Sequence, residues 1–155
     1  MKSLLVGMML ASTLNAAPSR VVSLSGTVHS ADIGNQQSVG AVWLPSEPRR
    51  IEQFEFHLPR PIKGLHIEYR CHLQDTGDTQ WLSAGTPCGT QGEARRLESF
   101  AMRLSGPAAR LYQLRYWCQV DGASRPSGPY SDEAVCGTQG ESRELIGMKV
   151  ELVRM

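Results

Sequence analysis

Alternating apolar and polar residues close each of three similar segments of the chain. Segments 47–58, 93–104 and 141–152 align at offsets of 46 and 48 residues. Alternation of this kind places every second side chain on one face of a β-strand. The apolar members are Phe54, Phe56 and Leu58, then Phe100, Met102 and Leu104, then Met148, Val150 and Leu152. The pattern predicts three strands that each bury one face.

One further apolar residue precedes each alternating run by three positions. These residues are Ile51, Leu97 and Leu145. An odd spacing would turn them away from the core in a regular strand. A β-bulge would return each of them to the buried face, so we expect a bulge in all three strands.

A second alternating run opens each segment. Its apolar positions are Leu65, Ile67, Tyr69, Cys71 and Leu73, which match Tyr112, Leu114, Tyr116, Cys118 and Val120, with Val22, Leu24, Gly26 and Val28 in the same slots of the first segment. Turn signals follow the runs at residues 32–34, 75–77 and 121–122. No helical period is visible after the N-terminal segment. Each segment is therefore expected to consist of short strands.

Three such segments predict an all-β domain with approximate threefold symmetry, because one copy of about 46 residues cannot bury its apolar face alone. A β-prism is the favoured architecture and a β-trefoil the alternative. We place the single domain at residues 17–155, with repeats at 20–61, 62–107 and 108–155.

The first 16 residues have the layout of a secretory signal peptide, in which Lys2 precedes an apolar run and small residues follow it. Without Lys2, 15 basic residues balance 15 acidic ones. A neutral chain gives no reason to expect nucleic acid as a partner. No later segment has transmembrane length, so we expect no membrane insertion after cleavage. The expected destination is secreted or periplasmic.

The four cysteines occupy two equivalent pairs of positions in the second and third segments. In an exported chain this arrangement favours disulfides. The pairing that respects the repeat joins Cys71 to Cys88 and Cys118 to Cys136. A four-cysteine zinc site is the weaker alternative, because no CxxC pair is present.

The run Cys-Gly-Thr-Gln-Gly-Glu occurs twice, at residues 88–93 and 136–141. Its glycines could expose backbone amides to an anion or a sugar hydroxyl. The run lacks the lysine and the strand-to-helix context of a phosphate-binding loop. A tight turn that feeds the following strand is the better explanation.

The candidate ligand-binding residues are aromatic and polar side chains expected near the surface. Trp81 could stack on a sugar ring while neighbouring polar groups take its hydroxyls, or it could simply cap the core. The full candidate set is Trp81, Asp75, Gln74, His72 and Trp117. No hydrolase or metalloprotease signature accompanies His72 and Asp75, so no catalytic residue, metal or cofactor is predicted.

The second segment resembles the ChW family, whose name denotes clostridial hydrophobic repeats with tryptophan. The resemblance lies in residues 69–75, Trp81, Gly85, residues 89–92 and the strand 96–104. The third segment matches in its opening strand and second half, and the first mainly in His29 and residues 50–52. The Gly-Trp dipeptide of the family pattern is absent, and the cysteines are additional to it. The resemblance implies a secreted or surface-associated module that contacts envelope glycans or proteins.

These observations lead us to expect an exported, non-enzymatic module that binds a carbohydrate or a protein at the cell envelope. The alternative is a periplasmic inhibitor or immunity-type protein that blocks a hydrolase through an extended loop. An enzyme that used His72 and Asp75 would require these residues to converge with a third polar group in a pocket.

Overall fold

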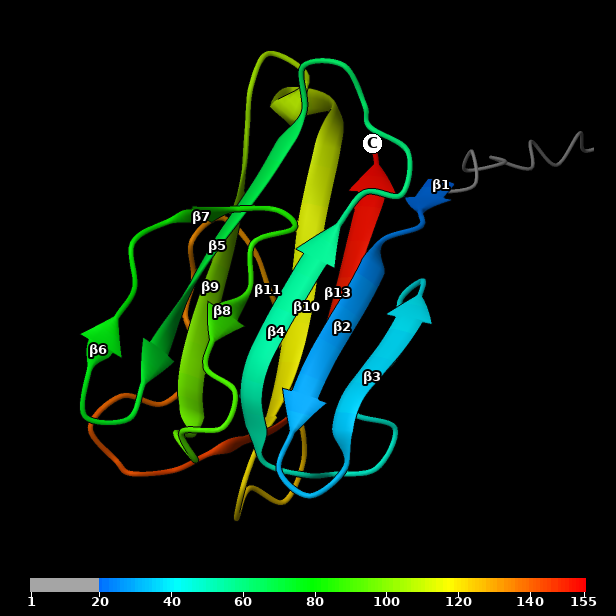
Figure 1. The fold of residues 1–155 in the computed structure, drawn as a ribbon. Helices are drawn as coiled ribbons and strands as arrows, with labels where there is room; N and C mark the ends of the chain where they lie inside the picture. The colour runs from blue at the N-terminus through cyan, green and yellow to red at the C-terminus, as the bar shows by residue number, and fades with distance from the viewer. Residues whose placement is uncertain (1–19) are drawn as a thin grey trace, which may run out of the picture.

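The computed structural model describes residues 20–155, which form an all-β structure as the alternation predicted (Figure 1). Three antiparallel sheets carry the described strands. The elements are β1 (Arg20–Val22), β2 (Ser25–Ser30), β3 (Gly34–Val39), β4 (Ile51–His57), β5 (His66–Leu73), β6 (Gly77–Asp78), β7 (Leu82–Ser83), β8 (Cys88–Gly89), β9 (Leu97–Ser105), the 3-10 turn η1 (Ala109–Leu111), β10 (Tyr112–Val120), β11 (Ser127–Tyr130), β12 (Cys136–Gly137) and β13 (Leu145–Arg154).

Each sheet is built on one long antiparallel strand pair from one segment of the chain. The pairs are β2 with β4 in the first sheet, β5 with β9 in the second and β10 with β13 in the third. Each pair carries one register shift near its end, where Ser30 pairs with Ile51, Leu73 with Leu97, and Val120 with Leu145. The expected bulges are therefore confirmed. They bring Ile51, Leu97 and Leu145 to the core, where all three are fully buried.

Short strands connect each sheet to its neighbour. β8 lies between β5 and β9 in sequence but pairs with β4, and β12 pairs with β9. At the corresponding place on β13, Leu44 forms an isolated bridge with Met148 through two backbone hydrogen bonds of 2.9 Å. The described residues thus form three separate sheets, in contrast to the continuous closed sheet that a trefoil requires.

The core fills the space between the three sheets. Ring–ring contacts run through it from Phe54 to Tyr69 and Phe100, and from Phe100 to Tyr116, at centroid distances of 5.1–5.6 Å. Most inward positions of the alternating runs are buried; the exceptions, which remain half-buried, are Val22, Leu58, Leu104 and Tyr112. Burial of these large side chains is the main source of stability, because each contributes on the order of 2 kcal/mol.

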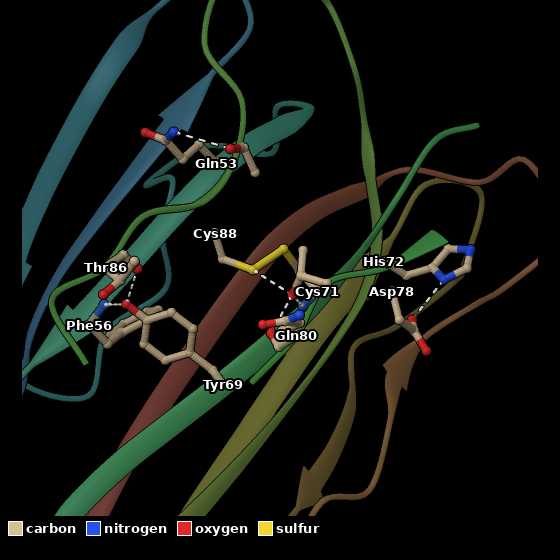
Figure 2. Close-up of a disulfide and its surroundings, with 11 residues drawn as sticks. Gln53, Phe56, Tyr69, Cys71, His72, Asp78, Gln80, Thr86 and Cys88 are labelled. Carbon is tan, nitrogen blue, oxygen red and sulfur yellow. Dashed lines mark hydrogen bonds and ion pairs between the residues drawn. A yellow bond between two sulfur atoms is a disulfide. The ribbon is translucent and has the colours of Figure 1, made fainter. Parts of the chain in front are cut away.

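Two disulfides, Cys71–Cys88 and Cys118–Cys136, confirm the predicted pairing, and Figure 2 shows the first of them. They contain all four cysteines, which leaves none for a zinc site. Each bond runs from a long strand to the short strand that joins the next sheet. The disulfides therefore link neighbouring sheets.

One sequence assignment was wrong. Val22 was placed in the opening strand of the first segment, but it lies in β1, which pairs with β13, and Val22 faces Leu152. The chain leaves β1 at Ser23 and enters β2 at Ser25, so the alternation of Val22, Leu24, Gly26 and Val28 runs across two strands.

The expected signal peptide, residues 1–16, lies outside the described residues. Within residues 20–155, no helix has the length and apolarity needed to cross a membrane.

Candidate functional site

A groove of about 360 Å³ opens where the end of β4 meets the start of β5. Its floor is apolar and its rim carries imidazole, hydroxyl and carboxylate groups. The lining residues are His57, Leu58, Pro61, Leu65, His66, Ile67, Glu68, Ser83, Ala84 and Ser105. An apolar floor with a few polar groups around it is the usual composition of a small-ligand site.

Trp81 does not line this groove, but Arg103 connects its ring to the lining residue Glu68. The guanidinium of Arg103 lies 4.2 Å from the centre of the Trp81 ring and that of Arg70 lies 5.0 Å from it. Arg103 donates to Glu68 at 3.2 Å and to Glu133 at 2.8 Å. Trp81 is therefore held in place by cation–π contacts.

The charges around Arg103 are matched locally. The hydrogen bond from Arg103 holds the pKa of the Glu68 carboxyl below its ordinary value, with smaller contributions from Ser105 and His66. Glu68 is thus an anionic acceptor on the groove rim at neutral pH. It can accept hydrogen bonds from ligand hydroxyls without a proton of its own to release.

His72 does not reach the groove. Its Nδ1 lies 2.8 Å from Asp78 (Figure 2). Its Nε2 lies 3.8 Å from the buried carboxylate of Glu98. Gln139 from the next segment donates to the same Asp78 oxygen at 3.2 Å. His72 is engaged in a network that ties the second and third segments together.

The first segment contains an equivalent network, which supports a structural role for His72. His29 lies 2.8 Å from the side-chain oxygen of Asn35, and Gln91 of the next segment reaches the same oxygen at 3.3 Å. Gln91 and Gln139 come from the repeated Gly-Thr-Gln-Gly run. The glutamine of that run therefore bridges neighbouring segments.

The glycine that follows each of Cys88 and Cys136 permits a close backbone approach. A Cβ at Gly89 would lie 2.2 Å from the carbonyl oxygen of Glu52, and one at Gly137 would lie 2.4 Å from that of Glu98. Both glycines have a positive φ, of 111° and 109°. These two glycines therefore serve close backbone packing within short strands, whereas the sequence favoured a tight turn.

Gln74 and Asp75 lie in the turn after β5. The side-chain oxygen of Gln74 accepts the amide of Arg96 at 3.5 Å, and Asp75 has a φ of 59°. Both residues thus shape the turn. No contact connects either of them with Trp81.

Trp117 lies on a different sheet. It projects from β10, where the ammonium of Lys149 lies 4.2 Å from its ring and 5.6 Å from that of Trp43. The structure consequently divides the five candidate residues among the outer face near β5, a turn, and the outer face of β10. None of the five lines the groove, although Trp81 is linked to the lining residue Glu68 through Arg103.

Sequence reasoning missed the groove residues themselves. His57 and His66 lie at strand ends on either side of a connection, and Ser83 is brought in by β7, which pairs with β5. Nothing in their local sequence marks them, because the groove exists only where β4, β5 and β7 come together. Within residues 20–155, no cluster of three or more His, Cys, Asp or Glu side chains is placed to hold a metal ion.

Residues 72–106 match the family described as Clostridial hydrophobic W. The matched stretch supports the resemblance seen in the sequence and contains Trp81, Ser83, Arg103 and Ser105. Searches of curated proteins and of solved structures found no match to this chain.

Proposed function

We propose that this protein is an exported, non-enzymatic module that binds a carbohydrate of the cell envelope in the groove beside Trp81. The observation that carries the proposal is the composition of the groove, an apolar floor of Leu58, Leu65 and Ile67 under a polar rim. A sugar ring presents C–H groups on its faces and hydroxyls around its edge. The two surfaces are complementary.

The polar groups on the rim suit hydroxyl recognition. Glu68 accepts, the hydroxyls of Ser83 and Ser105 donate and accept, and His57 and His66 can do either according to their tautomers. Trp81 stacks on Arg103, which in turn bonds the groove residue Glu68. Its role in the proposal is to add an aromatic edge and to hold Arg103 and Glu68 in position.

The match to Clostridial hydrophobic W supports a place at the envelope, as the resemblance implies. We further infer that residues 20–61, 62–107 and 108–155 are three divergent copies of one repeat. The equivalent pairings of Cys88 with Phe54, Cys136 with Phe100 and Leu44 with Met148 support this inference.

Export follows in this proposal from the signal-like segment 1–16, and the two disulfides are compatible with an oxidising compartment. N-terminal sequencing of the mature protein tests it. A start at residue 17 is expected, and an intact Met1 in a protein retained in the cytoplasm would contradict it.

Isothermal titration with fragments of envelope polysaccharides tests the binding function. Trp81→Ala should weaken binding at least about tenfold, which corresponds to about 1.4 kcal/mol. Trp117→Ala is the matched control, since it removes an equally cation-stacked tryptophan from another sheet. Ser83→Val should weaken binding without disturbing Trp81.

Two outcomes would contradict the proposal. One is that the folded protein binds none of a panel of envelope polysaccharides. The other is an equal loss of affinity in Trp81→Ala and Trp117→Ala, which would show that the polysaccharide does not bind in the groove. Capture of one hydrolase in a stoichiometric complex, combined with silence, would favour an inhibitor instead.

A further inference from the structure

Strand β3 forms an open outer edge of the first sheet (Figure 1). Among the described elements it pairs only with β2, in an unbroken register from Gly34 to Val39. Its residues, Gly-Asn-Gln-Gln-Ser-Val, include no charge and no proline. One side of β3 thus presents backbone N–H and C=O groups along a regular six-residue strand.

The corresponding edges of the other two sheets are protected. β6 and β7 contain two residues each and are separated by a loop. β11 contains four residues, includes Pro129, and shifts register opposite Tyr116 and Cys118. Short strands, prolines and bulges are the usual devices that prevent edge-to-edge pairing. β3 has none of them.

Apolar side chains flank the two ends of β3. Ile33 directly precedes the strand and is 42% exposed, and Val39 ends it and is 65% exposed. Pairing of β3 with a further strand would explain why both apolar side chains are exposed at the ends of an otherwise polar edge.

We propose that β3 pairs with β3 of a second copy of this chain, antiparallel and with the register centred on Gln36. A twofold axis perpendicular to the sheet keeps the outer faces of both copies on one side. Odd-numbered residues must then lie opposite odd-numbered residues, and even-numbered opposite even-numbered. With Gln36 opposite Gln36, Val39 of each copy lies beside the turn of the other copy that contains Ile33, where the chain bends at Gly34 with a φ of 74°. The exposed apolar end of each copy is then covered by the other.

The polar residues also suit self-pairing. In this register Asn35 faces Gln37, and Gly34 faces Ser38. A charged residue near the centre would meet its like in the partner and oppose pairing, but β3 carries none. The Gln36 side-chain oxygen already accepts the amide of Ser46 at 2.9 Å, which leaves its NH₂ group to donate across the axis. These features fit a second copy, because twofold pairing meets no like charges and brings each exposed apolar end next to the other.

Sedimentation equilibrium from about 10 µM to about 1 mM tests the proposal, since an interface of one strand pair belongs to the weak, transient class. The wild-type chain should dimerise within this range. Val39→Lys should raise the dissociation constant at least about tenfold, because each dimer contains the substitution twice. Leu111→Lys is the matched control, an exposed apolar residue in η1, and should leave the constant unchanged.

The register is tested separately by Gln36→Cys, which should give a covalent dimer on mild oxidation because directly opposed Cβ atoms lie about 5 Å apart. Val135→Cys, on a different exposed site, should react much more slowly. A wild-type chain that stays monomeric at every concentration overturns the proposal, as does a dimer indifferent to Val39→Lys. Glycan titration is a separate readout, so failure here leaves the groove proposal standing.

Discussion

The junction between the first and third sheets lacks the covalent link that reinforces the other two. Cys71–Cys88 joins β5 to β8 on the first sheet, and Cys118–Cys136 joins β10 to β12 on the second. At the third junction Leu44 pairs with Met148 through backbone hydrogen bonds alone. The comparison teaches that the short cross-sheet pairing defines the junction, and that the disulfide is an addition to it.

The side chains packed beneath the two disulfide-bridged junctions also differ from those beneath the unbridged junction. Tyr69 and Tyr116 donate their buried hydroxyls to the carbonyl oxygens of Thr86 and Ala134 in the linking segments (Figure 2 shows the first). Gly26 occupies the equivalent position in the first segment. A Cβ there would lie 2.5 Å from the ring of Phe56 and 3.3 Å from Leu44, so these two side chains fill the space that a tyrosine takes elsewhere.

The largest effect is expected from blocking a cross-sheet pairing while its disulfide stays intact. Gly89→Ala places a Cβ against the Glu52 carbonyl at a positive φ. Backbone strain and overpacking together should lower the free energy of unfolding by about 3–5 kcal/mol. Urea denaturation measures this loss. Gly92→Ala, also at positive φ but with open space around the Cβ, should cost only about 1 kcal/mol.

Removal of one disulfide should cost somewhat less. Cys71→Ala with Cys88→Ala opens a loop with a sequence separation of 17 residues, for which loop entropy gives about 3 kcal/mol. The protein should still fold, because the third junction forms without a bridge. Loss of the cooperative urea transition in this variant would show that the disulfide is indispensable to its junction.

A smaller effect is expected from the tyrosine hydroxyl. Tyr69→Phe leaves the Thr86 carbonyl without its donor and should cost about 1–2 kcal/mol in urea denaturation. Phe56→Leu is the comparison variant at the unbridged junction. It removes the aromatic ring that packs over Gly26, whereas Tyr69→Phe removes a hydroxyl. A Tyr69→Phe protein as stable as wild type would show that the hydroxyl does not contribute to the stability of its junction.

The same hydroxyls predict a dependence on alkaline pH. Burial raises the pKa of Tyr69 and of Tyr116 to about 12. An unfolded tyrosine ionises near pH 10, so the unfolded state loses its proton first as the pH rises. Stability should be constant below about pH 10 and fall between about pH 10 and 12. Tyr69→Phe with Tyr116→Phe should flatten this decline in short thermal scans, and an unchanged slope would contradict the assignment.

Most of the fold could be predicted from the sequence, because alternation and repetition are local signals. It predicted the inward faces of the long strands, the bulges before Phe54, Phe100 and Met148, and both disulfides. It did not predict that β8 and β12 would join neighbouring sheets, because a two-residue strand has no pattern of its own. Val22 was misplaced for a related reason: an alternating run that crosses a break in the chain looks continuous.

The candidate site was less predictable. Trp81 was singled out as an aromatic in a polar loop; it does not line the groove but is linked to Glu68 on its wall through Arg103. His72, by contrast, is an outward polar residue whose partners, Asp78 and Glu98, lie on other strands, so its local sequence did not mark them. His57, His66 and Ser83 meet only through the packing of strand ends. A site of this kind depends on tertiary contacts that sequence periodicity does not encode.

Peptide mapping of one engineered protein tests most directly whether the three junctions are equivalent. Val28 occupies the slot of Cys71 and Cys118, and Leu44 that of Cys88 and Cys136, and both residues are buried. Val28→Cys with Leu44→Cys should therefore form a third disulfide, seen under non-reducing conditions together with the two native bonds. Free thiols at 28 and 44 in the folded protein, or mixed links to the native cysteines, would contradict the equivalence.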